Sequence, residues 1–432
     1  MHAKTYTALA LASLLSLGSA PSYGDGSGTG AGSWIGYVSG GNSASGTGSA
    51  VTAGSSNVAS GQGAFVGAGT ANQANGTSSL VIGGFDNRAV AIDSLVGAGA
   101  GNRATGLRAV LVGGGYNLAS GNFSFIGGGG RDGVVSTAAG STALDHIAAG
   151  KWASIGGGVG NRAGSSNSHT GSTVAGGEQN QALNSDASVG GGVGNLASGV
   201  AATVPGGAGN VASGDYSVAL GRRALTQTAG GSPTLHPGSF VFGDATNLDF
   251  NSAAANEFAV RASGGVRLVS AVNGSGVPIA GVTLAAGGGT WATLSDRAAK
   301  HDFTAVDAPA VLAKVLTLPV ATWRYRSETS GALHMGPTAQ DFHAAFGLGE
   351  GDTTITTVDS DGVALAALQA VQGALDTTEA VIAQQTQRLA QLRQRIAALE
   401  AASAELPQLT AALAELLRGS PPVSVPVAQP IP

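Results

Sequence analysis

The chain has 432 residues with 72 glycines, 10% charged residues and no cysteine, and its formal net charge is −5. Without cysteine there is no disulfide framework and no thiol chemistry, and the acidic balance argues against a protein that binds nucleic acid, which needs a basic surface. Glycine does not recur at every third position, so collagen is excluded. A repetitive solenoid and a flexible linker both remain open.

Residues 1–24 have the pattern of a signal peptide. Lys4 gives a basic start, residues 7–17 are apolar but too short to cross a bilayer, and small residues follow. Pro21 would disfavour a cut after Ala20, so we expect cleavage after Gly24. No later run of about 20 apolar residues occurs, so we expect an exported protein without a transmembrane segment.

Residues 25–225 form a glycine-rich array with a period of 15 residues. Each unit approximates Gly-x-x-Asn-x-Ala-Ser-Gly-x-x-Ser followed by two apolar residues and Gly-Gly. The asparagines that mark the period are Asn42, Asn57, Asn72, Asn87, Asn102 and Asn117, and again Asn180, Asn195 and Asn210. A fixed period of this size predicts a solenoid. We expect Asn and Gly to supply the left-handed corners, and each unit to hold two strands of about 5 residues, stacked in about 12 coils at ~4.8 Å.

The array also predicts self-association. A coil with two or three large apolar side chains buries little surface alone, so three solenoids packed side by side are expected. A disordered Gly/Ser linker is the alternative, but it has no reason to keep the asparagine register. Residues 131–150 and 161–170 change the spacing, so we expect loops there.

The unit resembles the head repeats of trimeric autotransporter adhesins of the YadA-like type, and residues 217–224 look like the last coil of such a head. The resemblance implies a homotrimer of left-handed parallel β-rolls at the surface of a Gram-negative bacterium, with a host or cell-surface ligand. The chain ends in a Pro-rich segment rather than in the membrane anchor of those adhesins, so we expect no such anchor.

Other sites find little support in the sequence. The Gly-x-Gly-x-x-Gly spacings lack a strand–helix context, no phosphate-binding loop is present, and the histidines and acidic residues show no metal-binding spacing, so we expect no cofactor and no metal. A solenoid that binds carbohydrate or ice remains an alternative. No aromatic or charged residue recurs at one coil position, so the sequence points to no ligand.

Residues 226–294 are expected to form a β-rich neck or connector. Alternating apolar residues predict strands at 239–244, 257–262 and 266–269. Residues 282–291 contain three consecutive glycines, and we expect this segment to be flexible, exposed and suited to lie beside a cleavage site.

Ser295 and Lys300 follow this connector at a spacing that does not favour contact. On a helix they would point about 140° apart, and on a strand they would face opposite sides, so only the fold or another protomer could pair them. A lysine acts as a base to serine only in its neutral form, which requires removal from water or neighbouring cations. By spacing alone, a solvated loop is the simpler interpretation.

The wider sequence resembles the S74 peptidase family, the intramolecular chaperone domain of phage tailspikes and tail fibres. The resemblance starts with Ser295-Asp296-Arg297 and Lys300, continues through Trp323-Arg324-Tyr325 and His334-Met335-Gly336-Pro337, and closes at residues 358–368. It implies a domain, assigned here to residues 295–375, that trimerises, templates the preceding fibre and then cuts the Leu294–Ser295 bond. Ser295 would be the nucleophile of this single-turnover serine peptidase and Lys300 its base, with Asp296 and His334 supporting. No external substrate is expected.

Residues 376–418 are predicted to form a coiled coil. Apolar residues follow alternating steps of three and four, with Thr378 and Gln385 in the same stripe. The apolar members are Leu368, Val371, Leu375, Ile382, Leu389, Leu392, Ile396 and Leu399. We expect Pro407 to interrupt the helix, a restart at 409–417, and a disordered Pro-rich tail at 419–432.

The predicted fold is therefore mainly β: a trimeric left-handed parallel β-roll, a small α+β chaperone domain and a C-terminal coiled coil. The predicted function is an exported fibre or adhesin whose chaperone domain drives assembly and cuts itself off. A fibre with an uncleaved trimerisation cap is the alternative.

Overall fold

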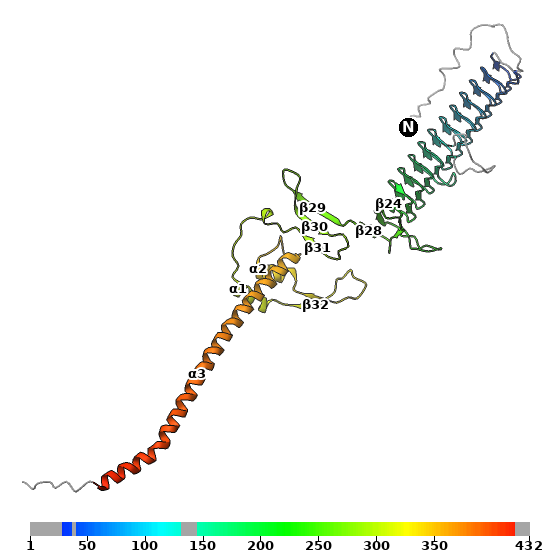
Figure 1. The fold of residues 1–432 in the computed structure, drawn as a ribbon. Coiled ribbons are helices and arrows are strands. Elements are labelled where there is room, and N and C mark those ends of the chain that lie inside the picture. Colours follow the sequence, from blue (N-terminus) through cyan, green and yellow to red (C-terminus); the bar gives the residue numbers. More distant parts are fainter. Residues whose placement is uncertain (1–27, 37–39, 131–144, 420–432) are drawn as a thin grey trace, which may run out of the picture. The chain divides into compact units, whose positions relative to one another are not determined.

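The computed structural model describes residues 28–36, 40–130 and 145–419 (Figure 1). The predicted signal peptide lies outside these residues, as do residues 420–432 of the predicted tail. The chain divides into two compact units. The first comprises residues up to Val266 together with Leu284–Thr290, and the second comprises Arg267–Thr283 and the residues from Trp291 onward.

The first unit is a parallel β-solenoid, as predicted, with about 14 turns where about 12 were expected (Figure 1). Each turn contributes one strand to each of two sheets, and the strands of a sheet lie in chain order. The strands of the larger sheet are β1 Trp34–Ile35, β3 Ala50–Val51, β5 Phe65–Val66, β7 Leu80–Val81, β9 Leu95–Val96, β11 Val110–Leu111, β13 Phe125–Ile126, β15 Ser154–Ile155, β17 Thr173–Val174, β19 Ser188–Val189, β21 Thr203–Val204, β22 Gly207–Ala208, β24 Val218–Arg222, β26 Phe240–Gly243 and β28 Phe258–Arg261.

The smaller sheet runs alongside it. Its strands are β2 Ser43–Ala44, β4 Val58–Ala59, β6 Gln73–Ala74, β8 Arg88–Ala89, β10 Arg103–Ala104, β12 Leu118–Ala119, β14 Ile147–Ala148, β16 Arg162–Ala163, β18 Gln181–Ala182, β20 Leu196–Ala197, β23 Val211–Ala212, β25 Ala224–Leu225 and β27 Phe250–Asn251. Most strands contain two residues, fewer than the five expected, because turns and bends take up most of each coil.

The core is a double stack of small apolar side chains. In nearly every two-residue strand the second side chain points inward: Val66, Val81 and Val96 from the larger sheet are fully buried. The smaller sheet contributes alanines such as Ala59 and Ala74, also fully buried. An alanine opposite a valine leaves room for only one branched side chain per coil, which explains why the sequence is rich in small residues.

The recurring asparagines have a different role from the one expected. Asn102 is fully buried, and its side-chain Nδ2 donates to the carbonyls of Ala98 (3.0 Å) and Gly114 (2.8 Å). Its Oδ1 accepts from the backbone N–H of Asn117 at 3.1 Å. These asparagines do not have positive φ angles. They form a hydrogen-bonded ladder inside the solenoid, while glycine and other residues occupy the left-handed corners.

The ladder keeps its register across both predicted interruptions. Leu118 pairs with Ile147 across residues 131–144, which lie outside the described part of the chain, and His146 takes the place of an asparagine. Arg162 pairs with Gln181, so this coil has 19 residues instead of 15. The second expected loop is thus an insertion into a continuous ladder. Both expected loops were drawn too wide, because Ile147–Ala148 form β14 and Arg162–Ala163 form β16. The stacking of parallel strands also continues beyond residue 225, the predicted end of the head, as far as Arg261.

The second unit starts with a three-stranded sheet of β29 (Val266–Val272), β30 (Pro278–Leu284) and β31 (Trp291–Thr293). A single 3-10 turn, η2 (Arg297–Ala299), follows, then α1 (Ala308–Thr317) and an antiparallel pair, β32 (Ala321–Trp323) and β33 (His334–Gly336). Helix α2 (Ala339–Phe346) begins at the Thr338 cap. Part of the segment expected to be flexible, residues 282–284, belongs to strand β30.

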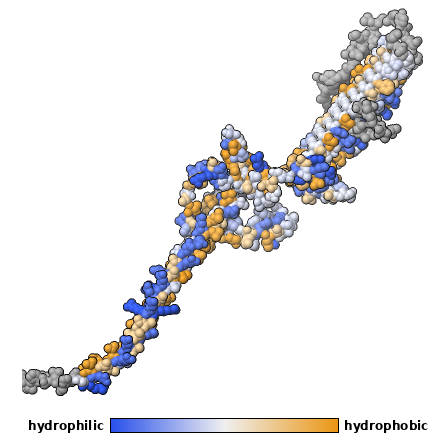
Figure 2. All heavy atoms as spheres, viewed as in Figure 1, coloured by the Kyte–Doolittle hydropathy of each residue, from blue (hydrophilic) through white to orange (hydrophobic). Residues whose placement is uncertain are grey.

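Helix α3 (Thr357–Gly419) is the longest element (Figure 1). It packs against α1 near its start, and it continues through Pro407, so the predicted break is wrong. Its apolar stripe is exposed in the single chain; Leu389, for example, is 56% exposed. Apolar and polar residues both reach the surface along it (Figure 2). Over the described residues, no helix has the length and apolar character that crossing a membrane requires.

Candidate functional site

The predicted scissile bond lies directly after an edge strand. Strand β31 ends at Thr293, and the N–H of Leu294 donates to the carbonyl of Gly281 in β30 at 3.0 Å. This bond prolongs the sheet by one residue. The Leu294–Ser295 peptide is therefore held at the point where the sheet ends and the 3-10 turn begins.

The turn brings Ser295 and Lys300 together. Asp296 caps η2 because its carboxylate accepts the N–H of Ala298 at 2.9 Å. The backbone then closes through the N–H of Lys300, which donates to the carbonyl of Arg297 at 3.1 Å. As a result, Lys300 Nζ donates to Ser295 Oγ at 2.5 Å. The expectation that local geometry could not form this pair is wrong, because the segment is a single capped turn, neither a long helix nor a strand.

Contacts within the next residues hold the turn. The Arg297 guanidinium lies 4.6 Å from the centre of the Phe303 ring. His301 Nδ1 and Asp302 Oδ2 are 2.6 Å apart, and Asp302 has a positive φ of 57°. Ser295 and Lys300 are exposed to solvent in the single chain. In this arrangement Lys300 donates to Ser295, so activating the hydroxyl would require the lysine to lose its proton.

His334 lies in a separate cluster. Its ring stacks on Trp323 with centroids 4.9 Å apart, and Tyr325 lies 5.3 Å from it. His334 Nε2 is 2.9 Å from Glu328 Oε2, and the hydrogen bonds from His334 and then Ser330 hold the pKa of Glu328 below its usual range. Among the hydrogen bonds and ring contacts of the described residues, none joins His334 to Ser295 or Lys300. The sequence does not point to Glu328. This residue lies six positions before His334 in a hairpin, and neither helix nor strand periodicity brings residues at that spacing together.

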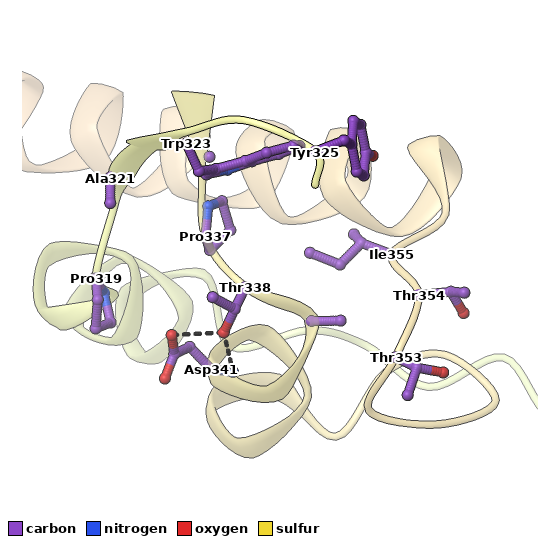
Figure 3. Close-up of a pocket in the computed structure, with 12 residues that line it drawn as sticks. Pro319, Ala321, Trp323, Tyr325, Pro337, Thr338, Asp341, Thr353, Thr354 and Ile355 are labelled. Carbon is purple, nitrogen blue, oxygen red and sulfur yellow. Dashed lines mark hydrogen bonds between the residues drawn. The ribbon is translucent and has the colours of Figure 1, made fainter. Parts of the chain in front are cut away.

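A cavity of about 560 Å³ lies beside this cluster (Figure 3). Trp323 and Tyr325 lie along one side of it, and Thr338 and Asp341, joined by a 2.7 Å hydrogen bond, lie on the opposite side. No residue of the Ser295–Lys300 turn lines it. Among the described residues, His, Asp and Glu side chains do not gather into a group that could hold a metal ion.

Comparison with known proteins bears on this second unit. A family model described as Peptidase_S74, chaperone of endosialidase, matches residues 295–347. Residues 295–347 resemble a chaperone-of-endosialidase domain. The match begins at Ser295 and ends at Gly347, the C-cap of α2, so it contains both the Ser295–Lys300 turn and the His334 cluster. A search of curated proteins finds no significant match. The S74-like segment is shorter than the predicted domain, which extended to residue 375.

Proposed function

We propose that this protein is an exported homotrimeric fibre whose S74-like domain drives trimer assembly and then cuts the Leu294–Ser295 bond. The observation that carries the proposal is the 2.5 Å contact between Lys300 Nζ and Ser295 Oγ at the first residues of the matched segment. This pairs a nucleophile with a potential base beside the carbonyl of an extended edge strand, which is the geometry that activated nucleophiles need.

The proposed cut is a single intramolecular event. Neutral Lys300 takes the proton of Ser295 Oγ, which attacks the carbonyl carbon of Leu294. The C–N bond breaks as the lysine returns the proton to the leaving nitrogen, and an ester links Leu294 to Ser295. Water then hydrolyses the ester, which leaves a carboxylate on Leu294 and a new N-terminus at Ser295. Asp296 is the positioning residue, because its cap folds the turn that brings Lys300 to Ser295.

Two apolar surfaces support self-association. On α3 the exposed stripe has the heptad spacing of a coiled coil. On the larger sheet of the solenoid, the outward side chains of five successive strands stack in register: Phe65, Leu80, Leu95, Val110 and Phe125. The equivalent outward positions of the smaller sheet include Gln73, Arg88 and Arg103, which suit water. We propose that three copies meet through the apolar sheet and the helix stripe.

Assembly and cleavage are coupled in this proposal. Ser295 and Lys300 are solvent-exposed in one chain. If neighbouring copies cover the turn, the removal of water favours the neutral amine, which can then act as a base. The cut would therefore follow trimerisation, once the S74-like domain has directed assembly of the fibre.

The experiment is expression of the full chain, followed by gel electrophoresis, N-terminal sequencing and mass measurement by light scattering. We expect a fragment that starts at Ser295 and a trimeric mass. Ser295→Ala and Lys300→Ala should each abolish the fragment and keep the trimer, whereas Lys314→Ala, an exposed lysine of α1, should behave as wild type. Cleavage that persists in either variant would reject the pair, and an uncleaved wild-type trimer would favour the trimerisation cap instead.

The remaining parts of the proposal concern the head and its location. We propose that the solenoid is a YadA-like head, exported by residues 1–24 and displayed by a Gram-negative bacterium, where it meets a host or cell-surface ligand. The parallel coils and the 15-residue asparagine period support this. Deletion of residues 1–24 should leave the protein inside the cell; if it is still found outside, the leader is misassigned.

A further inference from the structure

One corner of the solenoid carries large side chains in an unfavourable backbone conformation. In most coils the residue six positions after the ladder asparagine has a positive φ, and in two of the first coils it is glycine, Gly48 and Gly63. In four successive coils it is instead Asp93, Arg108, Phe123 and Trp152, with φ between 53° and 59°. A left-handed conformation costs an L-residue about 1–2 kcal/mol. Strain retained by bulky side chains points to a role for them.

These four side chains form a continuous row, which we call the aromatic corner. Arg108 Nε lies 3.2 Å from Asp93 Oδ2, and its guanidinium lies 5.8 Å from the centre of the Phe123 ring. The Phe123 and Trp152 rings are 6.2 Å apart. Lys151 Nζ lies 4.2 Å from the Trp152 ring centre. The expectation that no aromatic or charged position recurs along the coils is therefore wrong: Asp93, Arg108 and Phe123 lie 15 residues apart, and Trp152 continues the row in the next coil.

The row ends at Trp152, and we call the exposed surface around this ring the ledge. The next coil has Gly171 at the corner and supplies no side chain to stack on Trp152, which is 53% exposed. From the coil after that, Asp186 Oδ1 lies 2.5 Å from where a Cβ of Gly171 would be. The long coil that follows places a polar loop beside this corner. Asn167 Oδ1 accepts the backbone N–H of Asn122 at 3.0 Å, and the Ser165 hydroxyl lies 2.8 Å from His169 Nδ1. The ledge thus combines an aromatic surface with amide, hydroxyl and ammonium groups.

We propose that the aromatic corner binds a saccharide. The apolar C–H face of a sugar ring packs on an aromatic side chain, and its hydroxyls need hydrogen-bonding groups at the edge, a combination that the ledge supplies. A second copy of this chain fits less well, because close packing would remove water from Arg108, Asp93 and Lys151. The proposal goes beyond the proposed function and depends on neither the cleavage nor the trimer.

The test is binding of the full-length protein to an array of neutral and acidic glycans, followed by titration of the bound glycans. We expect Trp152→Ala to weaken binding at least tenfold. Tyr216→Ala is the matched control, because Tyr216 occupies the same corner position with φ 59° and is 70% exposed, outside the row. It should bind like wild type. Thermal melts of both variants should agree, which separates a contact with sugar from a structural effect.

Three outcomes would overturn the proposal: no glycan bound by the wild type, equal binding by Trp152→Ala, or a changed oligomeric mass in that variant. The last would identify the corner as a contact between copies. Ser295→Ala should bind glycan normally. A failure of cleavage therefore leaves the saccharide site standing, and loss of the site leaves the cleavage proposal standing.

Discussion

Replacement of Asn102 by alanine tests whether the buried ladder stabilises the solenoid. The side chain makes three hydrogen bonds, to Ala98, Gly114 and Asn117, at 2.8 to 3.1 Å, in a fully buried position. Alanine leaves three backbone groups without that partner. At about 1 kcal/mol each, the free energy of unfolding should fall by roughly 3 kcal/mol. Urea unfolding followed by circular dichroism should show a midpoint lower by on the order of 1 M.

The control is the next residue. Arg103→Ala removes an exposed side chain from the same strand, β10, and should leave the free energy of unfolding within about 0.5 kcal/mol of wild type. If Asn102→Ala and Arg103→Ala unfold at the same urea concentration, the ladder does not stabilise the solenoid. A larger loss would indicate that one broken rung separates the coils on either side, as expected for a solenoid whose coils contact only their neighbours.

Further predictions concern the other parts of the chain. Burial lowers the pKa of His146 below its ordinary value of 6.5. The unfolded chain therefore binds a proton more readily than the folded chain, and the free energy of unfolding should fall as the pH drops below that value. In acid unfolding curves, His146→Asn should reduce this loss of stability. Gly99→Ala should prevent folding of its coil, because a Cβ would lie 2.0 Å from the carbonyl oxygen of Gly114, and protease digestion would reveal the exposed coil. Pro407→Ala should raise the melting temperature of the helix, because it restores a hydrogen bond and relieves a clash that together are worth up to about 3 kcal/mol; an unchanged melt would mean that Pro407 does not destabilise the helix. Asp296→Ala should slow the appearance of the Ser295 fragment while Asp296→Asn restores it, and equal rates would remove the cap from the mechanism.

The sequence predicted the solenoid well because its period is a direct consequence of stacking. The 15-residue spacing appears in most coils, and in the structure these coils stack in register with an aliphatic side chain from one sheet and an alanine from the other pointing inward. The role of asparagine was predicted wrongly, because its backbone propensity says only which φ angles it tolerates. Its role in the ladder depends on the carbonyls of the residues 4 positions before and 12 positions after the asparagine. Only the stacked coils bring those carbonyls to the side chain.

The candidate site was predicted less completely. Ser295 and Lys300 were identified, but their contact depends on one 3-10 turn capped by Asp296, and helix or strand periodicity does not describe such a turn. The Glu328 partner of His334 was missed for a similar reason, since hairpin geometry sets that distance. The continuation of α3 through Pro407 is the opposite case, in which a strong local breaker does not end the helix.

The uninterrupted ladder has a practical consequence for protein engineering. Register is set by the hydrogen bonds between coils, because the pairing of Arg162 with Gln181 absorbs four extra residues without disturbing the strands on either side. A foreign peptide inserted at the same corner, between Ser166 and Asn167, should therefore be carried as a side loop. The solenoid would serve as a display scaffold, in which the inserted peptide can vary in length while the pairing of the strands stays the same.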